Sequence, residues 1–173
     1  RGEDPYISFI GNVDPKTLKA TPTENKFFGE WEWHTDMSYI QIPPTFSLLH
    51  SRKIPEEGGD TGFCSQVMAA RAISEILRKR VLNLQIKHDS IYDSSGILRP
   101  GMTPPVSPIE ANGCTHPIIR EVPSTGDEAL FLGRRKNAYV VGLSLSENEE
   151  LLEELWNFAT LPEFQYRHSW KVG

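Results

Sequence analysis

The fold of this chain is constrained most by a succession of short runs rich in β-branched and aromatic residues. Such runs, bounded by glycine, proline or polar residues, are typical of β-strands. The runs that predict strands are Tyr6–Val13, Trp31–Asp36, Phe46–His50, Thr61–Ser65, Val81–His88, Ala129–Leu132, Ala138–Val141 and Phe164–Trp170. Only two stretches show helical spacing, so the pattern predicts an α+β domain, mainly β, or a β-sandwich with helices packed outside.

Two amphipathic helices are predicted among the strands. Apolar residues recur every three or four positions from Met68 to Leu77, which predicts one helix of about three to four turns. A second helix is expected to begin at a capping box of Ser146 and Glu149 and to end before Pro162. Residues 89–112 are rich in proline, serine and glycine. A stretch of that length favours a loop that covers a substrate, and a disordered segment is the alternative.

The size and charge of the chain narrow the class of protein. A length of 173 residues fits one domain with a substantial core. With a formal net charge of −5, the chain has no overall positive charge that would attract nucleic acid or an anionic membrane. No apolar run approaches the roughly 18 residues that a membrane helix needs. We therefore expect neither nucleic acid nor a membrane as a partner, while association into a homo-oligomer stays open.

The cysteines and the chain ends bear on location and completeness. Cys64 and Cys114 do not make a disulfide framework and lack the spacing of a zinc site. They are typical of reduced thiols in a cytoplasmic protein, although a single extracellular disulfide stays open. The sequence begins at Arg1 without Met and stops at Gly173 directly after a strand-like run. Both ends look like cuts through a domain.

The segment Trp33-His-Thr-Asp36 carries the clearest signal for chemistry. Side chains two positions apart in an extended strand point to the same side, so His34 and Asp36 are expected to reach one metal ion together. One further histidine would complete a two-histidine, one-carboxylate triad, which leaves three positions of a ferrous ion open. A His-x-Asp pair by itself is weak, because a turn aspartate beside a surface histidine gives the same letters.

Several further motifs accompany this pair in order. They are Pro43-Pro44, Gly58-Gly-Asp-Thr61, Thr115-His-Pro117, Ala129-Leu-Phe131 and Pro162-Glu-Phe-Gln-Tyr-Arg-His168. Together with Trp33-His-Thr-Asp-Met-Ser-Tyr39 they resemble the taurine dioxygenase and aryloxyalkanoate dioxygenase family over most of the chain. The resemblance implies a double-stranded β-helix, or jelly roll, with helices packed outside. Residues 1–173 would be the central portion of a single oxygenase domain, incomplete at both ends.

The resemblance also implies a site and a reaction. His34 and Asp36 match the first two iron(II) ligands, and Thr61 matches a threonine whose hydroxyl binds a carboxylate of 2-oxoglutarate. The family's second iron histidine, and an arginine for the distal carboxylate of 2-oxoglutarate, come after the segment that ends here at Gly173. The implied activity is hydroxylation of a small organic substrate by O₂, with release of succinate and CO₂. The given sequence alone would be inactive.

The residues expected near the substrate differ from those of the enzymes that act on taurine. Those enzymes carry an Asn where this chain has Glu30, and Asn-Glu-Gly-Phe where it has Gly133-Arg-Arg-Lys136, so taurine is not expected. The cationic cluster Arg134-Arg-Lys136 favours an anionic substrate, and a solvated turn between strands is an equal alternative. Trp31 and Trp33 alternate with His34 and are expected in the core.

Other histidines and other classes of protein are alternatives to this interpretation. His50, His88, His116 and His168 match no ligand of the family and are expected to be packed or partly exposed residues. A non-catalytic jelly-roll binding module that has lost its metal is one alternative function. A zinc hydrolase that uses the same His-x-Asp pair is a weaker one.

Overall fold

The computed structural model describes residues 32–93 and 96–173. Its elements, in chain order, are β1 (Thr61–Cys64), α1 (Gln66–Ala72), α2 (Glu75–Val81), β2 (Gln85–Lys87), β3 (Thr115–Pro117), β4 (Ile119–Glu121), β5 (Glu128–Leu130), β6 (Tyr139–Val140), α3 (Leu145–Ala159), a 3₁₀ turn (Pro162–Phe164) and β7 (Gln165–His168). Within these residues the strands form three antiparallel sheets, β1–β7, β3–β2–β6 and β4–β5. The predicted combination of helices and strands is confirmed.

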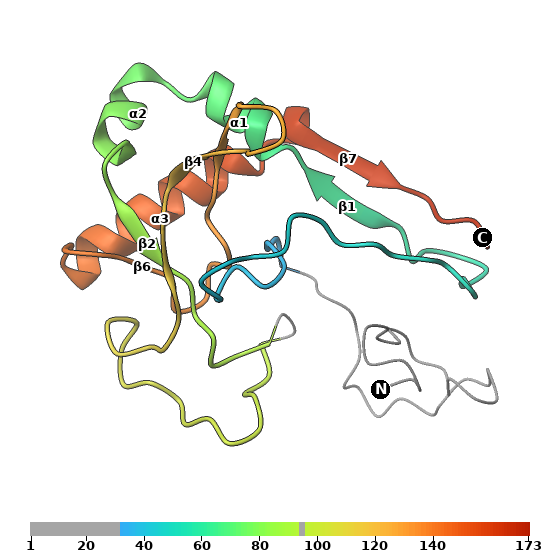
Figure 1. Ribbon diagram of the computed structural model, residues 1–173, viewed down its shortest axis with the longest axis horizontal. Helices are drawn as coiled ribbons and strands as arrows, with labels where there is room; N and C mark the ends of the chain where they lie inside the picture. Colours follow the sequence, from blue (N-terminus) through green and yellow to red (C-terminus); the bar gives the residue numbers. More distant parts are fainter. Residues whose placement is uncertain (1–31, 94–95) are drawn as a thin grey trace.

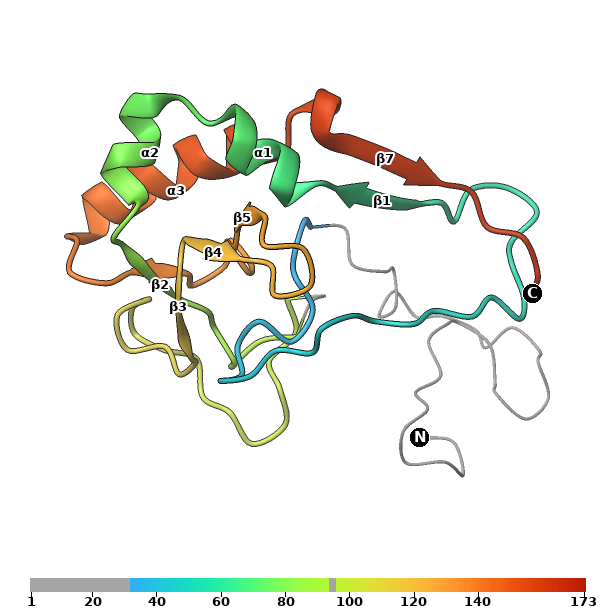
Figure 2. The same ribbon diagram turned by 45° about the horizontal axis from the view of Figure 1, so that its top comes forward.

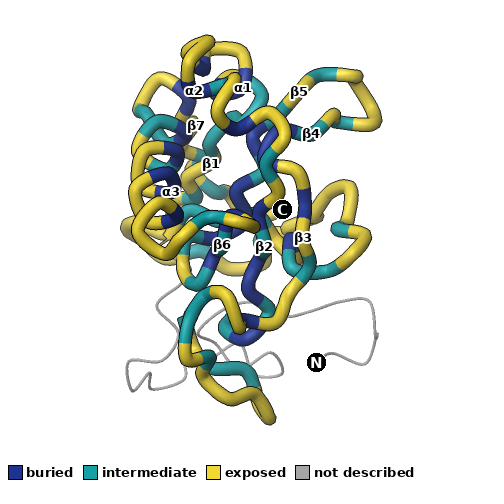
Figure 3. Tube along the Cα trace, turned by 90° about the vertical axis from the view of Figure 1, so that its left-hand side faces the viewer, coloured by how far each residue is buried: buried dark blue, intermediate teal, exposed yellow. Residues whose placement is uncertain are grey.

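The hydrophobic core lies between the helices and the central sheet. Figures 1 and 2 show α1, α2 and α3 gathered together above β2, β4 and their neighbours, while β1 and β7 extend away side by side. Buried positions follow α3 and β2 (Figure 3). The core residues with no exposed surface are Ala69, Val81, Ile86, Ile118, Val140, Leu151, Leu152, Leu155 and Ala159. The apolar stripes of the helices therefore bury their side chains against one small sheet.

The helix predicted between Met68 and Leu77 is in fact two helices. Ile73 leaves the helical conformation with ψ 135°, which ends α1, and Ser74 then caps α2 by accepting the Leu77 N–H at 3.2 Å. A serine hydroxyl at this position satisfies a backbone donor that a helix start leaves without a partner. The apolar spacing continues across the break, so periodicity alone predicts one helix where the chain turns.

The helix that begins in the predicted capping region is α3, but its cap lies two residues earlier. Ser144, not Ser146, accepts the Glu147 N–H at 3.3 Å, and the Glu147 carboxylate accepts the Ser144 N–H at 2.9 Å. The predicted partner Glu149 instead pairs with Arg135. The sequence Ser144-Leu-Ser-Glu-Asn-Glu149 contains two overlapping Ser-x-x-Glu patterns. The earlier one starts the helix, and the α-helix ends at Ala159, before Pro162 as predicted.

Several predicted strands are present in shorter form. Strand β1 agrees with the prediction to within one residue, while β2 covers only Gln85–Lys87 of the predicted run Val81–His88. Strands β5, β6 and β7 fall within or next to their predicted ranges. The predicted strand Tyr6–Val13 lies outside the described residues.

Two strand predictions are wrong. No strand forms over Phe46–His50, where Phe46 and Leu48 are 74% and 90% exposed. In the described part of the run Trp31–Asp36, only His34 makes a β-bridge, and a turn follows from Asp36. An aromatic or β-branched run becomes a strand only where a neighbouring segment takes up its backbone hydrogen bonds.

In the predicted loop, residues 89–93 and 96–112 hold one bridge, between Tyr92 and Leu98, and no helix or longer strand. In the parts of the chain that the structure describes, no helix is long and apolar enough to cross a membrane.

Candidate metal centre

His34 and Asp36 meet because the chain turns directly after His34. The Thr35 N–H donates to the Gly133 carbonyl at 2.7 Å, which fixes the backbone beside His34. Residues 36–39 then form a turn in which Met37 has a φ of 49°. The two side chains therefore come together as expected, but through a turn and not through the alternation of a strand.

The ring of His34 has a defined orientation toward the carboxylate. Its Nδ1 lies 2.9 Å from the Glu32 carbonyl, and its Nε2 lies 3.2 Å from Asp36 Oδ1. Because a carbonyl oxygen only accepts, Nδ1 must carry a proton, and in a neutral ring the lone pair of Nε2 faces the carboxylate. Two acceptors at this distance repel each other unless a cation lies with them. A metal ion bound by both atoms, or a proton on either of them, would remove this repulsion.

The separation of the two atoms fits adjacent ligands of one ion. Ligand atoms about 2.1 Å from an ion and at right angles to each other lie about 3.0 Å apart. The observed 3.2 Å between His34 Nε2 and Asp36 Oδ1 agrees with this. A histidine whose other nitrogen donates to a carbonyl is also the usual arrangement of a metal-bound imidazole. Among the described residues, no group of three or more His, Cys, Asp or Glu side chains is placed to hold an ion.

Ser47 orients the carboxylate. Its hydroxyl donates to Asp36 Oδ2 at 3.0 Å, so Oδ2 is occupied while Oδ1 faces the imidazole. The Asp36 side chain is 55% exposed and that of His34 only 14%, so the pair lies at the surface of the described part with its histidine side covered. This arrangement presents one oxygen and one nitrogen to a common point.

Thr61 starts β1 and has a fixed partner. The Trp170 indole N–H donates to Thr61 Oγ1 at 2.8 Å, and Thr61 pairs with His168 in the β1–β7 ladder. Because the hydroxyl accepts from the indole, its own hydrogen is available for an anion. The structure thus gives Thr61 the donor character that the sequence suggests.

A small cavity of about 180 Å³ lies beside His34. Trp33 lines it together with Gly62, Cys64 and Trp156. Trp33 is only partly buried, and the prediction for Trp31 lies outside the described residues. Burial raises the pKa of the Cys64 thiol, which donates to the Ala159 carbonyl at 3.0 Å. Cys64 therefore acts as a packed thiol in the wall of this cavity and not as a nucleophile.

His88 and His116 are held by packing. His88 is 1% exposed, stacks on Phe131 with ring centres 5.0 Å apart and meets His116 edge-on at 5.2 Å. Burial, with a smaller effect of His116, lowers the pKa of His88 to about 3. His116 donates to the Ile40 carbonyl at 3.1 Å and so fixes the chain just after the Asp36 turn. His50 is exposed.

The cationic cluster is engaged inside the molecule. We call residues Gly133–Asn137 the basic segment. Arg134 is 7% exposed and donates to the Tyr92 carbonyl at 3.1 Å. Arg135 pairs with Glu149 at 2.7 Å, and Lys136 Nζ lies 3.9 Å from the centre of the Tyr92 ring. These contacts favour a structural role for the three charges over capture of an anionic substrate.

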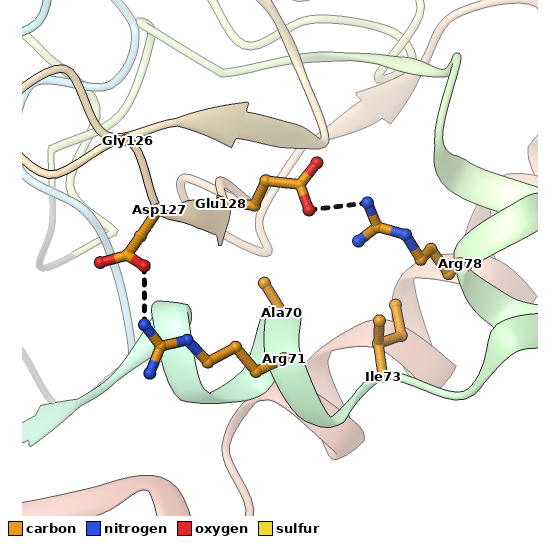
Figure 4. Close-up of a pocket in the computed structure, with 7 residues that line it drawn as sticks. All are labelled: Ala70, Arg71, Ile73, Arg78, Gly126, Asp127 and Glu128. Atoms are coloured by element: carbon orange, nitrogen blue, oxygen red, sulfur yellow. Dashed lines mark hydrogen bonds and ion pairs between the residues drawn. The ribbon is translucent and has the colours of Figure 1, made fainter.

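The larger cavity, of about 590 Å³, lies elsewhere, between the helices α1 and α2 and the β4–β5 hairpin. Figure 4 shows two ion pairs across it, Arg71 with Asp127 and Arg78 with Glu128, each at 2.6 Å. Arg71 lowers the pKa of Asp127, which keeps that carboxylate charged. Because each cation has its own anion, the cavity offers no excess charge to a ligand. We therefore place the candidate chemistry at the His34–Asp36 pair and not in this larger cavity.

Comparison with known proteins identifies the family. The model of the family described as taurine catabolism dioxygenase TauD, TfdA family, matches residues 8–173. The chain belongs to this family. The alpha-ketoglutarate-dependent 2,4-dichlorophenoxyacetate dioxygenase of Burkholderia sp. (strain RASC) is 34% identical over 171 residues, covering 94% of this chain and 54% of that protein. The resemblance read from the motifs is confirmed.

Two further relatives support the assignment to the TauD/TfdA family. The (S)-phenoxypropionate/alpha-ketoglutarate-dioxygenase of Sphingobium herbicidovorans is 31% identical, over 96% of this chain and 61% of that protein. The crystal structure of AAD-2 in complex with Mn(II) and N-oxalylglycine superposes with a TM-score of 0.67 at 30% identity, covering 81% of this chain and 55% of that one. The chain thus spans between about half and three fifths of the length of these relatives.

Two contributors to the candidate centre are not visible in the sequence. Ser47 follows Asp36 by 11 positions, and Gly133 is distant in sequence from Thr35, whose N–H it accepts. Neither residue carries a local motif that marks it. Only the tertiary fold brings them to the pair, whereas His34 and Asp36 could be found from their own spacing.

Proposed function

We propose that this TauD/TfdA family member is an iron(II)- and 2-oxoglutarate-dependent dioxygenase that hydroxylates a small anionic organic substrate and releases succinate and CO₂. The observation that carries the proposal is the 3.2 Å approach of His34 Nε2 to Asp36 Oδ1, with Nδ1 already engaged. The relatives from Burkholderia and Sphingobium are named as alpha-ketoglutarate-dependent dioxygenases of 2,4-dichlorophenoxyacetate and of (S)-phenoxypropionate. The AAD-2 structure holds Mn(II) and N-oxalylglycine, an analogue of 2-oxoglutarate.

The metal centre would use side chains in distinct roles. His34 and Asp36 supply two ligands, and Ser47 keeps Oδ2 of Asp36 occupied so that Oδ1 faces the ion. When bound, iron supplies the oxygen activation and the oxidation of 2-oxoglutarate, which side chains cannot perform. By the family resemblance, the third ligand follows Gly173, and so does the arginine that binds the distal carboxylate.

Thr61 would bind the cosubstrate. Its oxygen accepts from the Trp170 indole at 2.8 Å, so its hydrogen is available for a carboxylate of 2-oxoglutarate. A neutral donor of this kind binds an anion without placing an additional charge next to the ion.

The fold of the intact domain is part of the proposal. The three antiparallel sheets and the superposition on AAD-2 support a double-stranded β-helix, with α1, α2 and α3 outside it. Residues 1–173 would form its central portion. A binding module without metal gains no support from the relatives named above, each of which is described as a dioxygenase.

Anaerobic titration of the intact protein tests this function. Iron(II) followed by 2-oxoglutarate is expected to produce a visible charge-transfer band, because the cosubstrate would chelate the ion. Asp36→Ala should abolish the band, whereas Thr61→Val should preserve iron binding and require more 2-oxoglutarate to reach the same absorbance. A zinc hydrolase or a metal-free binding module would give no band in the unmodified protein, and that result would exclude the proposal.

A further inference from the structure

The basic segment lies against the chain that carries His34. His34 and Arg134 form an antiparallel β-bridge, and the Gly133 carbonyl accepts the Thr35 N–H at 2.7 Å. The backbone of residues 133 and 134 therefore fixes the backbone that carries the His34 imidazole. Any movement of this backbone moves the candidate ligand with it.

The other side of the basic segment holds the start of the loop 89–112. Arg134 Nη1 donates to the Tyr92 carbonyl at 3.1 Å, and Lys136 lies over the ring of the same tyrosine. Asn137 Nδ2 donates to Asp89 Oδ2 at 3.0 Å. Three contacts, from residues 134, 136 and 137, thus reach Asp89 and Tyr92 at the start of the loop.

The basic segment has little freedom to shift. Gly133 has a φ of 69°, and a Cβ at this position would lie 1.9 Å from Nδ1 of His88, so the backbone is seated directly on a buried ring. Arg134 is 7% exposed, and a guanidinium at such a depth is stable only where hydrogen bonds replace water. A short, fixed segment between two partners can hold both in one arrangement.

We propose that Arg134 is a positioning residue that couples the loop at Asp89–Tyr92 to His34. The inference rests on the proposed metal centre and adds a residue that the family motifs do not mark. Arg134 does not touch the ion. It holds the Tyr92 carbonyl with its side chain and His34 with its backbone, so that the loop and the candidate ligand keep one relative position.

Mn(II) binding by the intact protein, followed by the electron paramagnetic resonance of free Mn(II), tests this role. Arg134→Met should weaken binding about tenfold, the lower end of the loss seen when groups that orient ligands are removed. Arg134→Lys keeps a charge and a donor and should recover part of the affinity. Arg135→Met, which removes only the contact with Glu149, should bind Mn(II) like the unmodified protein.

A second readout separates positioning from general loss of stability. The Thr35 amide should exchange its hydrogen faster in Arg134→Met, because its bond to Gly133 loosens, and should be unaffected in Arg135→Met. Leu151→Ala creates a cavity in the core and should lower stability without changing Mn(II) affinity. Equal weakening in Leu151→Ala and Arg134→Met would overturn the proposal, as would unchanged affinity in Arg134→Met.

A further variant covers the case in which Arg134→Met does not fold. Asn137→Gly removes the contact with Asp89 but tolerates the local φ of 53°, and should weaken Mn(II) binding about twofold by the same route. Unchanged affinity there would also contradict the coupling. If the unmodified protein itself binds no Mn(II), the proposed metal centre fails, a result distinct from failure of Arg134.

Discussion

At the scale of single residues, the candidate centre depends on how two side chains are oriented and not only on their spacing. The His-x-Asp pattern predicts the pair His34 and Asp36, and the structure brings them within 3.2 Å. The structure adds the Glu32 carbonyl and the Ser47 hydroxyl, which fix one atom of each side chain. These hydrogen-bond partners determine which ring nitrogen of His34 carries the proton and which carboxylate oxygen of Asp36 remains available to an ion.

Ser47→Ala is expected to weaken Mn(II) binding about tenfold, because the Asp36 carboxylate loses the donor that orients Oδ2. The change removes one hydroxyl from an exposed contact and should leave the free energy of unfolding within about 0.5 kcal/mol of its original value. Titration with Mn(II) and urea denaturation measure the two quantities. Ser146→Ala, on the exposed first turn of α3, is the matched control, and equal affinities in the two variants would contradict the role of Ser47.

The buried ring of His88 makes stability depend on pH. Burial, aided by His116, lowers its pKa from 6.5 to about 3 in the folded protein. Between these values the unfolded chain binds a proton that the folded chain does not, so the free energy of unfolding falls as the pH drops below about 6.5. From His88 alone we expect a loss on the order of 2 kcal/mol between pH 8 and pH 5.

Urea denaturation at pH 8 and pH 5 measures this loss. In His88→Gln, which does not titrate, the difference between the two pH values should shrink by an amount on the order of 2 kcal/mol. His50→Gln alters an exposed histidine and should preserve the full difference. A pH dependence that is the same in both variants would mean that His88 is not buried in its neutral form.

At the scale of elements, the sequence predicts which segments are helical better than where the helices begin. Apolar spacing runs through Ile73 and Ser74 without a break, yet α1 ends there and α2 starts. Spacing reports which side of a segment is buried, whereas caps depend on one hydroxyl and one amide. The same limit explains the strands, because Phe46–His50 has strand-like residues but no strand forms there.

The position of the α3 cap gives a paired prediction. Ser144→Ala should lower the free energy of unfolding by about 1 kcal/mol, since the Glu147 N–H loses its acceptor and the capping box is lost. Ser146→Ala lies inside the first turn and should change it by less than about 0.5 kcal/mol. Urea denaturation of the two variants decides between the overlapping patterns. A larger cost at Ser146 would show that the helix starts two residues later.

At the scale of the whole molecule, sequence patterns predicted the α+β class, and the family motifs predicted the relatives. What they could not predict is the tertiary support of the centre. The sequence of the cluster Arg134-Arg-Lys136 favours attraction of an anionic substrate or a solvated turn, yet Arg134 is buried against His34 and Tyr92. Charge in a sequence does not reveal whether an internal partner will neutralise it.

Ligand binding should stabilise the whole protein. On the proposed function, Mn(II) and N-oxalylglycine would bind the folded state, so at free concentrations about 100 times the dissociation constant they should add about 2.7 kcal/mol to the free energy of unfolding. A thermal melt with and without both ligands measures the shift. Asp36→Ala should show none. A shift of equal size in that variant would mean that the ligands bind away from the pair.

Gly62, which has no side chain, influences where His34 lies relative to strand β1. A Cβ on Gly62 would lie 2.9 Å from Cη2 of Trp33, so the indole next to His34 rests directly on the backbone of the strand that begins at Thr61. The absence of a side chain at Gly62 thus lets the Trp33 ring lie against β1 and limits the distance between His34 and Thr61. A larger residue at position 62 would displace the Trp33 ring, and with it the adjacent His34, while leaving both proposed iron ligands unchanged in sequence.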